Sequence, residues 1–296
     1  MSNLGRPLLK SVTRVVGALK LPVLVANPFA AHRLPLHAQN FPLVLLYTAR
    51  AGSAALIKWF LFQTGYLDQA TELHRGVHRL SRSAQLRYRD YGWQALRLIV
   101  THEKPIFKLV RNPYDRAVSS FRSTVFHTRE KQSNPWGRKI VTAARKYSGK
   151  PLTAELSFRD FLRFVAMNGT EIGLINGHVA RQHVAGEDGC IDRIMKLECF
   201  AEEIRRIEFE YGLAQSPLES IARLRLEGSR LPEETNYMVC AADLEITSAY
   251  VRQGRFPAYE AFYDDETRRL VRECFAPSGK LGSDVKKSPL ACASIP

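Results

Sequence analysis

A guanidinium and a hydroxyl stand within the stretch Lys108–Phe121 in an order that suits the binding of an anion. Arg111 directly follows an apolar run, and Ser119 lies on the helix expected after it. A guanidinium offers two parallel N–H donors to a phosphate, and a hydroxyl adds one more donor. Local chemistry leaves two interpretations open: an anion site, or a capped surface helix whose arginine pairs with Asp115.

The residues around Arg111 predict the elements that must position it. The run 105–110 is apolar enough for a buried parallel strand, so Arg111 leaves the carboxyl end of a strand, where open α/β sheets bind ligands. Asn112 can cap a following helix, and Pro113 suits its first turn because the missing N–H has no partner there. Asp115 suits the positive end of the helix dipole.

The helical period divides the residues of this helix between two faces. The apolar positions share one face, which we expect to pack on the sheet: Tyr114, Ala117, Val118, Phe121 and Val125. The polar positions share another face, with the Ser119 hydroxyl pointing outward: Asn112, Asp115, Arg116 and Ser119. The polar face is therefore the expected ligand side of the helix.

A second candidate anion site lies earlier, after the apolar run 43–47, which predicts another buried strand. Residues 48–52 form a loop, Ser53 is the expected N-cap of a helix over 54–64, and Gly65 is the expected stop. Backbone N–H groups around Gly52 and Ser53 can bind an anion at a helix start. The loop alone is equally a generic strand–turn–helix with Arg50 at the surface.

The first motif resembles the 3′-phosphate-binding motif of sulfotransferases, especially carbohydrate sulfotransferases, with the pattern V-R-[DN]-P-[YF]-x-R-x-x-S. Every defined position is present, as Val110, Arg111, Asn112, Pro113, Tyr114, Arg116 and Ser119. The resemblance implies that Arg111 and Ser119 hold the 3′-phosphate of 3′-phosphoadenosine 5′-phosphosulfate (PAPS). It also implies a three-layer α/β fold, related to the P-loop fold, with a central parallel sheet flanked by helices.

The loop at 48–53 is similar to the family's 5′-phosphosulfate loop, P-K-x-G-[CST]-[TS], but departs from it. Arg50 replaces the lysine, and Ala49 and Ala54 replace the proline and the last hydroxyl residue. The family lysine is held to stabilise the bridging oxygen of the leaving phosphate, so the resemblance assigns that catalytic role to Arg50. The implied cofactor-binding residues of the loop are Arg50, Ala51, Gly52 and Ser53.

Transfer of a sulfuryl group to an alcohol needs a base near the acceptor hydroxyl, and histidine has a suitable pKa. We expect His178 to be that base, with His183, His102 and Glu103 as alternatives. Either His178 or His183 can instead serve only as a hydrogen-bonding group of a loop. The resemblance runs, patchily, from Leu43 to about Phe275.

Alternation of strands and helices, with a third strand over 191–197, predicts one large α/β domain at 41–277. Residues 1–40 form a basic arm whose apolar run is interrupted by Lys20, Pro22 and Pro28, so a membrane-spanning helix is not expected. Two interpretations stay open: a loosely attached arm, or an arm whose basic residues contact an anionic membrane surface peripherally. The polar segment 128–153 is expected to be a mobile insertion with a short helix, and 278–296 a loose tail.

The net charge of +14 indicates anionic partners, although no nucleic-acid-binding motif is present, so specific nucleic-acid binding is not expected. The five cysteines are far apart and form no C-x-x-C pair, which argues against a zinc site and favours a reducing, cytoplasmic location.

These patterns predict a PAPS-dependent sulfotransferase that uses no metal and acts on a carbohydrate or other hydroxyl acceptor. The alternative is a non-catalytic nucleotide-binding or interaction protein on the same fold, because Arg50 replaces the usual lysine. A P-loop kinase is a weaker alternative, since no G-x-x-x-x-G-K-[ST] sequence exists.

Overall fold

A computed structural model describes residues 34–67, 90–130, 135–151, 155–170, 177–183, 187–221, 240–247 and 256–275. The chain divides into two compact units, one formed by Met1–Val110, His183–Ala222 and Ser278–Pro296, the other by Arg111–Gln182 and Arg223–Pro277. The first unit contains the sheet and the second is helical.

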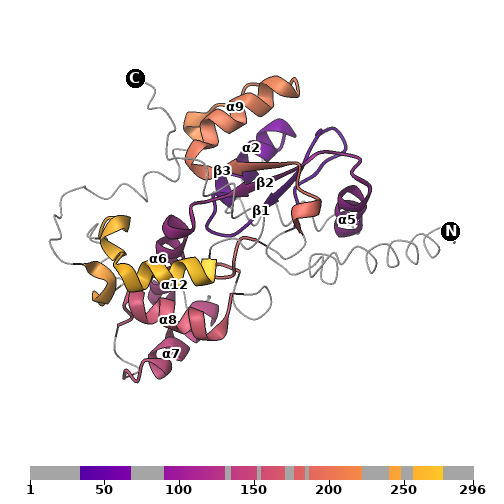
Figure 1. Cartoon of the computed structure of the whole chain (residues 1–296). Helices are drawn as coiled ribbons and strands as arrows, with labels where there is room; N and C mark the ends of the chain where they lie inside the picture. Colours follow the sequence, from indigo (N-terminus) through magenta and orange to yellow (C-terminus); the bar gives the residue numbers. More distant parts are fainter. Residues whose placement is uncertain are drawn as a thin grey trace, which may run out of the picture. The chain divides into compact units, whose positions relative to one another are not determined.

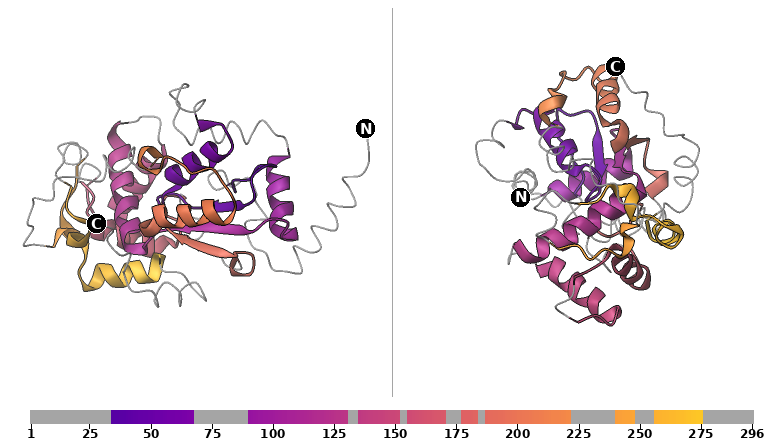
Figure 2. Two further views of the ribbon diagram at one scale, coloured as in Figure 1. Left: turned by 90° about the horizontal axis from the view of Figure 1, so that it is seen from above. Right: turned by 90° about the vertical axis from the view of Figure 1, so that its left-hand side faces the viewer.

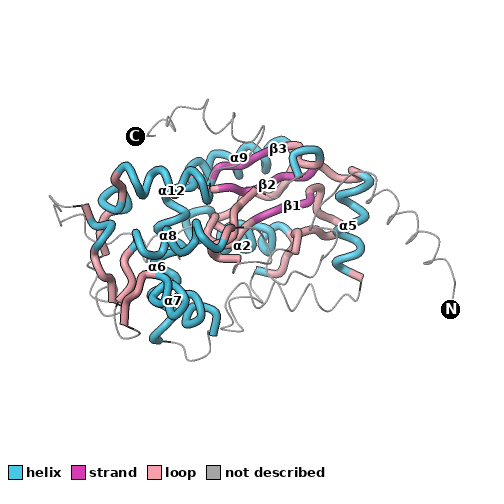
Figure 3. The backbone as a smooth tube through the Cα atoms, turned by 60° about the horizontal axis from the view of Figure 1, so that its bottom comes forward, coloured by secondary structure: helices cyan, strands magenta, loops and turns pink. Residues whose placement is uncertain are grey.

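The first unit is built on a parallel sheet of three strands, β1 (Val44–Tyr47), β2 (Ile106–Val110) and β3 (Arg193–Lys196), in the order β1-β2-β3 (Figure 3). The register places Tyr47 opposite Leu109 and Val110 opposite Lys196. The carboxyl ends of the strands therefore meet at one edge. The predicted strands are confirmed, each shortened by a residue or more.

Helices pack on both faces of this sheet; Figure 1 labels them. On one face the odd-numbered residues of β1 and β2 pack with α2 (Ser53–Gln63) and α9 (Phe200–Glu210), burying Trp59 and Ile204 completely. On the other face Val44 and Ile106 pack against α5 (Tyr91–Thr101). Because a strand covered on both faces buries alternate residues in two cores, a continuous apolar run results. The predicted three-layer α/β fold is confirmed.

Part of the predicted arm belongs to the packed first unit. Leu36 is completely buried and exchanges two backbone hydrogen bonds of 2.9 Å with Leu45, while the His37 ring stacks on Tyr91 at 4.0 Å. Residues 1–33, which carry the rest of the predicted arm and its membrane contact, lie outside the described residues. In the described ranges, no helix combines the length and the apolar character needed to span a membrane.

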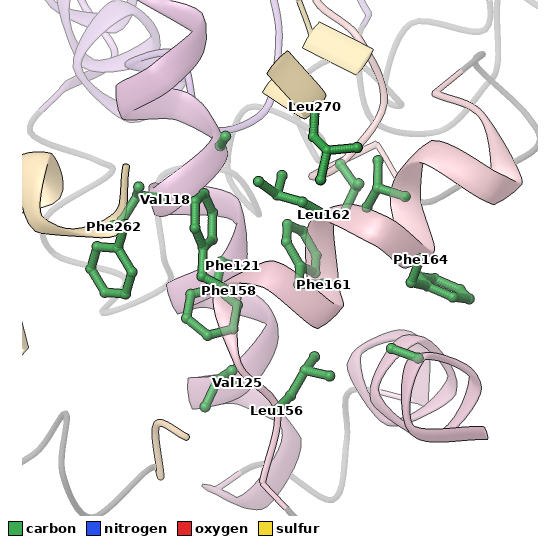
Figure 4. Close-up of a cluster of buried hydrophobic side chains, with 14 of the residues drawn as sticks. Val118, Phe121, Val125, Leu156, Phe158, Phe161, Leu162, Phe164, Phe262 and Leu270 are labelled. Carbon is green, nitrogen blue, oxygen red and sulfur yellow. The ribbon is translucent and has the colours of Figure 1, made fainter. Parts of the chain in front are cut away.

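The second unit is a helical assembly of α6 (Pro113–Glu130), α7 (Pro135–Tyr147), α8 (Phe158–Asn168) and α12 (Asp265–Phe275), seen from two further sides in Figure 2. Short 3₁₀ helices at Ala241–Asp243 and Tyr259–Phe262 complete it. The aromatic rings of Phe121, Phe158, Phe161 and Phe262 gather at its centre (Figure 4).

The expectation that the apolar face of α6 packs on the sheet is wrong. Val118 and Phe121 are completely buried, but their neighbours are Phe158 and Phe161 of α8 and Leu270 of α12. The helical period shows that a face is buried, whereas the identity of the covering element depends on the tertiary fold.

The helix α7 lies within the segment predicted to be a mobile insertion. Its Ile140, Val141 and Ala144 are buried in the core of the second unit. Although the segment is rich in basic residues, its apolar residues recur at helical spacing, so the helix is amphipathic. The mobility of 128–153 and the domain boundaries at 41 and 277 stay predictions.

The cysteines differ in state. Cys190, Cys240 and Cys274 are free thiols, whereas Cys199 is disulfide-bonded. The spacing of the cysteines did not predict that bond. Since stable disulfides are uncommon in a reducing compartment, the cytoplasmic location remains only a prediction.

Arg159 ties three segments of the second unit together. Its guanidinium donates to Asp243 Oδ1 at 2.7 Å, to Asp264 Oδ2 at 2.5 Å and to Glu266 Oε2 at 2.7 Å. Hydrogen bonding from Arg159 lowers the pKa of Asp243. Burial opposes the ionisation of Asp264, but hydrogen bonds from Arg159 and Thr267 outweigh it and hold the pKa of Asp264 well below its usual range.

We expect Arg159→Gln to lower the melting temperature at pH 7 by roughly 2–4 °C, through loss of a partly exposed network. A folded-state carboxyl pKa below the unfolded value of about 4 gives stability above that pH, which is lost as the pH falls through the folded pKa. The difference between variant and wild type should therefore narrow below about pH 4 in thermal denaturation. A pH-independent difference would contradict this account. Arg269→Gln, which removes an exposed pair with Glu273, is the control.

Candidate active site

The loop after β1 has an unusual backbone. Arg50 and Gly52 both adopt positive φ, 66° and 81°. Gly52 is the N-cap of α2, and no side chain makes a capping hydrogen bond there. Ser53, the expected N-cap, is instead the first helical residue and is buried. A glycine cap leaves the first N–H groups of the helix for other acceptors, because it has no side-chain oxygen.

The residues of this loop fit an anion. Thr48 Oγ1 is buried and makes no hydrogen bond within the described part of the chain. The first turn of α2 carries no acidic residue that would repel a negative charge. A buried hydroxyl with no partner is costly, and an uncapped helix start has a partial positive charge, so an anion would satisfy both.

Gly52 fits this position for two reasons. Its φ of 81° is unfavourable for residues with a Cβ, and a Cβ there would clash with Leu197 Cδ1 and lie 3.2 Å from Leu109 Cδ2. Gly65 has a similar φ of 77°, but a Cβ there would meet no atom within 4 Å.

We therefore expect Gly65→Ala to lower the free energy of unfolding by about 1 kcal/mol, which is the backbone cost alone. Gly52→Ala should cost roughly 2 kcal/mol or more, because displacement of Leu197 adds to the backbone cost. Urea denaturation of both variants measures the difference. Equal losses would show that the close approach of Leu197 does not matter.

Arg111 begins the second unit, at the start of α6. Asn112 Oδ1 accepts a hydrogen bond of 2.9 Å from the N–H of Tyr114, so the predicted cap is confirmed. The Arg111 guanidinium lies 5.7 Å from the centroid of the Tyr259 ring, within cation–π distance. Arg111 is half-buried, as suits a group that binds a ligand at a surface.

Two motif residues lie elsewhere than expected. Ser119, predicted to point outward, is only 4% exposed. Arg116, placed with it on the polar face, is completely buried, donates to the Ala180 carbonyl at 2.6 Å and lies 5.9 Å from the Phe275 ring centroid. The reason is that α6 is covered by chain segments on its polar side as well as on its apolar side. Arg116 thus supports the fold.

The four candidate bases differ in burial and in hydrogen-bond partners. His178 is half-buried, and its carbonyl accepts a hydrogen bond of 2.6 Å from Ser120 Oγ. His183 is buried, with Nδ1 3.4 Å from Glu187 Oε1. His102 and Glu103 are exposed and precede β2, at the sheet edge opposite to the loop that carries Arg50. The sheet topology therefore disfavours these last two as partners of Arg50.

A buried ionic cluster in the first unit was not predicted. The Lys108 ammonium, 2% exposed, pairs with Glu187, 4% exposed, which also faces His183. The sequence feature that could have predicted this cluster is the lysine within the apolar strand β2, since a buried lysine needs a carboxylate partner. The cluster lies on the face of β2 opposite to Phe107 and Leu109.

The predicted site residues thus form two groups, each placed within its own unit. Arg50, Ala51, Gly52 and Ser53 follow β1, whereas Arg111, Ser119 and His178 belong to the second unit. A family model described as "Sulfotransferase family" matches residues 40–275. No significant match was found among curated proteins or among solved structures.

Proposed function

Because the chain belongs to the sulfotransferase family, we propose that it takes the sulfuryl group from PAPS and transfers it to a hydroxyl group of a carbohydrate. The observation that carries this proposal is the uncapped start of α2 beside the buried Thr48 hydroxyl, which fits the anionic end of such a donor. The motif at Arg111–Ser119 supports it, because it follows in the order that the family requires.

Two sets of residues would hold the donor. The N–H groups of Gly52 and Ser53, together with the Thr48 hydroxyl, would bind the 5′-phosphosulfate, whereas the Ala51 N–H donates to the Thr48 carbonyl at 3.3 Å. Arg111 and Ser119 would bind the 3′-phosphate, through the guanidinium fork and a hydroxyl donor. No metal is part of this proposal.

The proposed reaction is an in-line displacement at sulfur. A bond forms between the acceptor oxygen and sulfur as the bond from sulfur to the bridging phosphate oxygen breaks, and adenosine 3′,5′-bisphosphate leaves. Arg50 stabilises the negative charge that develops on the bridging oxygen, by analogy with phosphoryl transfer. It acts as a fixed charge, because a guanidinium stays protonated at neutral pH. His178 accepts the proton of the acceptor hydroxyl.

A second candidate function is non-catalytic nucleotide binding on the same fold. It is favoured by Arg50, which is bulkier than the lysine of related loops and stands at a φ of 66°. Incubation of the full chain with PAPS carrying radioactive sulfur and with pools of neutral and acidic oligosaccharides separates the two. Labelled product that disappears in Arg50→Ala supports the enzyme. Nucleotide binding without label transfer to any pool supports the second candidate.

A further inference from the structure

The segment 177–182 is attached to α6 through its main chain. Ser120 Oγ donates to the His178 carbonyl at 2.6 Å, and Arg116 Nη2 donates to the Ala180 carbonyl at 2.6 Å. Both donors are completely buried. Because these two bonds use backbone carbonyls, they hold the main chain at His178 and Ala180 against α6 whatever side chains those two positions carry.

The side chain of Gln182 returns a pair of hydrogen bonds to Arg111. Gln182 Nε2 donates to the Arg111 carbonyl at 2.7 Å, and the Arg111 N–H donates to Gln182 Oε1 at 2.9 Å. Gln182 is 7% exposed, so water competes little for these bonds. The amide thus satisfies both main-chain polar groups of the residue that directly follows β2, as a neighbouring strand would.

This double hydrogen bond fixes the main chain of Arg111 from both sides of its Cα. Arg111 and Gln182 stand at the two points where the chain enters and leaves the first stretch of the second unit. A fixed main chain fixes the position from which the Arg111 side chain extends. The Tyr259 ring beside the guanidinium restricts the rotamers of that side chain. An arginine held in this way loses less conformational freedom when it binds a phosphate.

We propose that Gln182 is a positioning residue for Arg111 and thereby sets the preference of this protein for nucleotides that carry a 3′-phosphate. The inference rests on the proposed function, in which Arg111 binds that phosphate. Both hydrogen bonds between Gln182 and Arg111 involve main-chain atoms of Arg111, so in this role Gln182 acts on the phosphate through Arg111. Its effect should therefore depend on the 3′-phosphate and on the presence of the Arg111 guanidinium.

Calorimetric titration of the full chain with adenosine 3′,5′-bisphosphate and with adenosine 5′-monophosphate tests this role. Gln182→Met keeps the length of the side chain and removes both hydrogen bonds. We expect it to weaken binding of the bisphosphate about tenfold, in keeping with two lost hydrogen bonds, and to change binding of the monophosphate less than about twofold. A merely structural role would weaken both nucleotides equally, and that result would overturn the inference.

Gln182→Glu is the second variant, because its carboxylate still accepts from the Arg111 N–H but does not donate to the Arg111 carbonyl. Selective loss of bisphosphate affinity in this variant supports the inference even where Gln182→Met does not fold. Gln63→Met is the matched control, since Gln63 Nε2 also donates to a backbone carbonyl, that of Ala214, at 2.7 Å. Its affinity for the bisphosphate should equal that of the wild type.

A double-mutant cycle separates this inference from the proposed function. In an Arg111→Ala background, Gln182→Met should cause no further loss of bisphosphate affinity, because the group that it positions is gone. Additive losses would overturn the positioning role while leaving the proposed function intact. Failure of the wild type to bind the bisphosphate would overturn both, whereas wild-type affinity in Gln182→Met and Gln182→Glu would overturn this inference alone.

Discussion

Replacement of Arg111 by alanine is expected to weaken binding of adenosine 3′,5′-bisphosphate about 100-fold. A charged, bidentate hydrogen bond to phosphate contributes roughly 2–3 kcal/mol, which corresponds to a factor of about 30 to 150. Affinity for adenosine 5′-monophosphate should change little, because that nucleotide lacks the phosphate in question. The measurement is calorimetric titration of both nucleotides at one ionic strength, since salt screens charged contacts.

The matched control for this prediction is Arg122→Ala. Arg122 lies on the same helix, and its guanidinium is 5.4 Å from the Phe256 ring centroid, so its removal also changes the net charge by one unit. We expect wild-type affinity for the bisphosphate in this variant. Equal losses in the two variants would mean that overall charge, and not a specific contact of Arg111, attracts the nucleotide.

Replacement of Arg50 by alanine is expected to lower the rate of sulfuryl transfer by about 10²–10³-fold, as loss of a group that stabilises transition-state charge does in other enzymes. Binding of the bisphosphate product should fall less, because charge on the bridging oxygen develops only during transfer. Single-turnover kinetics with radioactive PAPS measures the rate, and calorimetry measures the binding. Arg50→Lys should retain most of the rate.

The backbone at Arg50 allows charge and conformation to be separated. At a φ of 66° both arginine and alanine are unfavourable, whereas glycine is not. Arg50→Gly should therefore be more stable than Arg50→Ala in urea by about 1 kcal/mol, yet equally slow in transfer. A fast Arg50→Gly enzyme would show that the guanidinium has no catalytic role.

The fold could be predicted largely from the sequence because its signals are local. Apolar runs identified β1 and β2. Asn112 caps α6 as its side chain predicts. The partner of the buried face of α6 could not be predicted, since Phe121 packs on Phe158 and Phe161 through tertiary contacts that periodicity does not encode.

The candidate site was predictable only in part. The motif pattern identified Arg111 and Ser119, but it could not show that Ser119 is buried or that Arg116 donates to Ala180. The pairing of Gln182 with Arg111 joins residues 71 positions apart. Contacts between residues so far apart in the sequence depend on the tertiary fold, and no local pattern of hydrophobicity or charge specifies them.

The proposed function requires that this protein recognise a nucleotide by its two phosphate ends, through the residues of the loop after β1 and through those at the start of α6. Its most direct test is calorimetric titration of the wild-type full chain with adenosine 3′,5′-bisphosphate, with adenosine 5′-monophosphate as the comparison. We expect saturable binding of the bisphosphate at one site, at least about tenfold tighter than binding of the monophosphate. No binding, or equal affinities for the two nucleotides, would contradict this requirement.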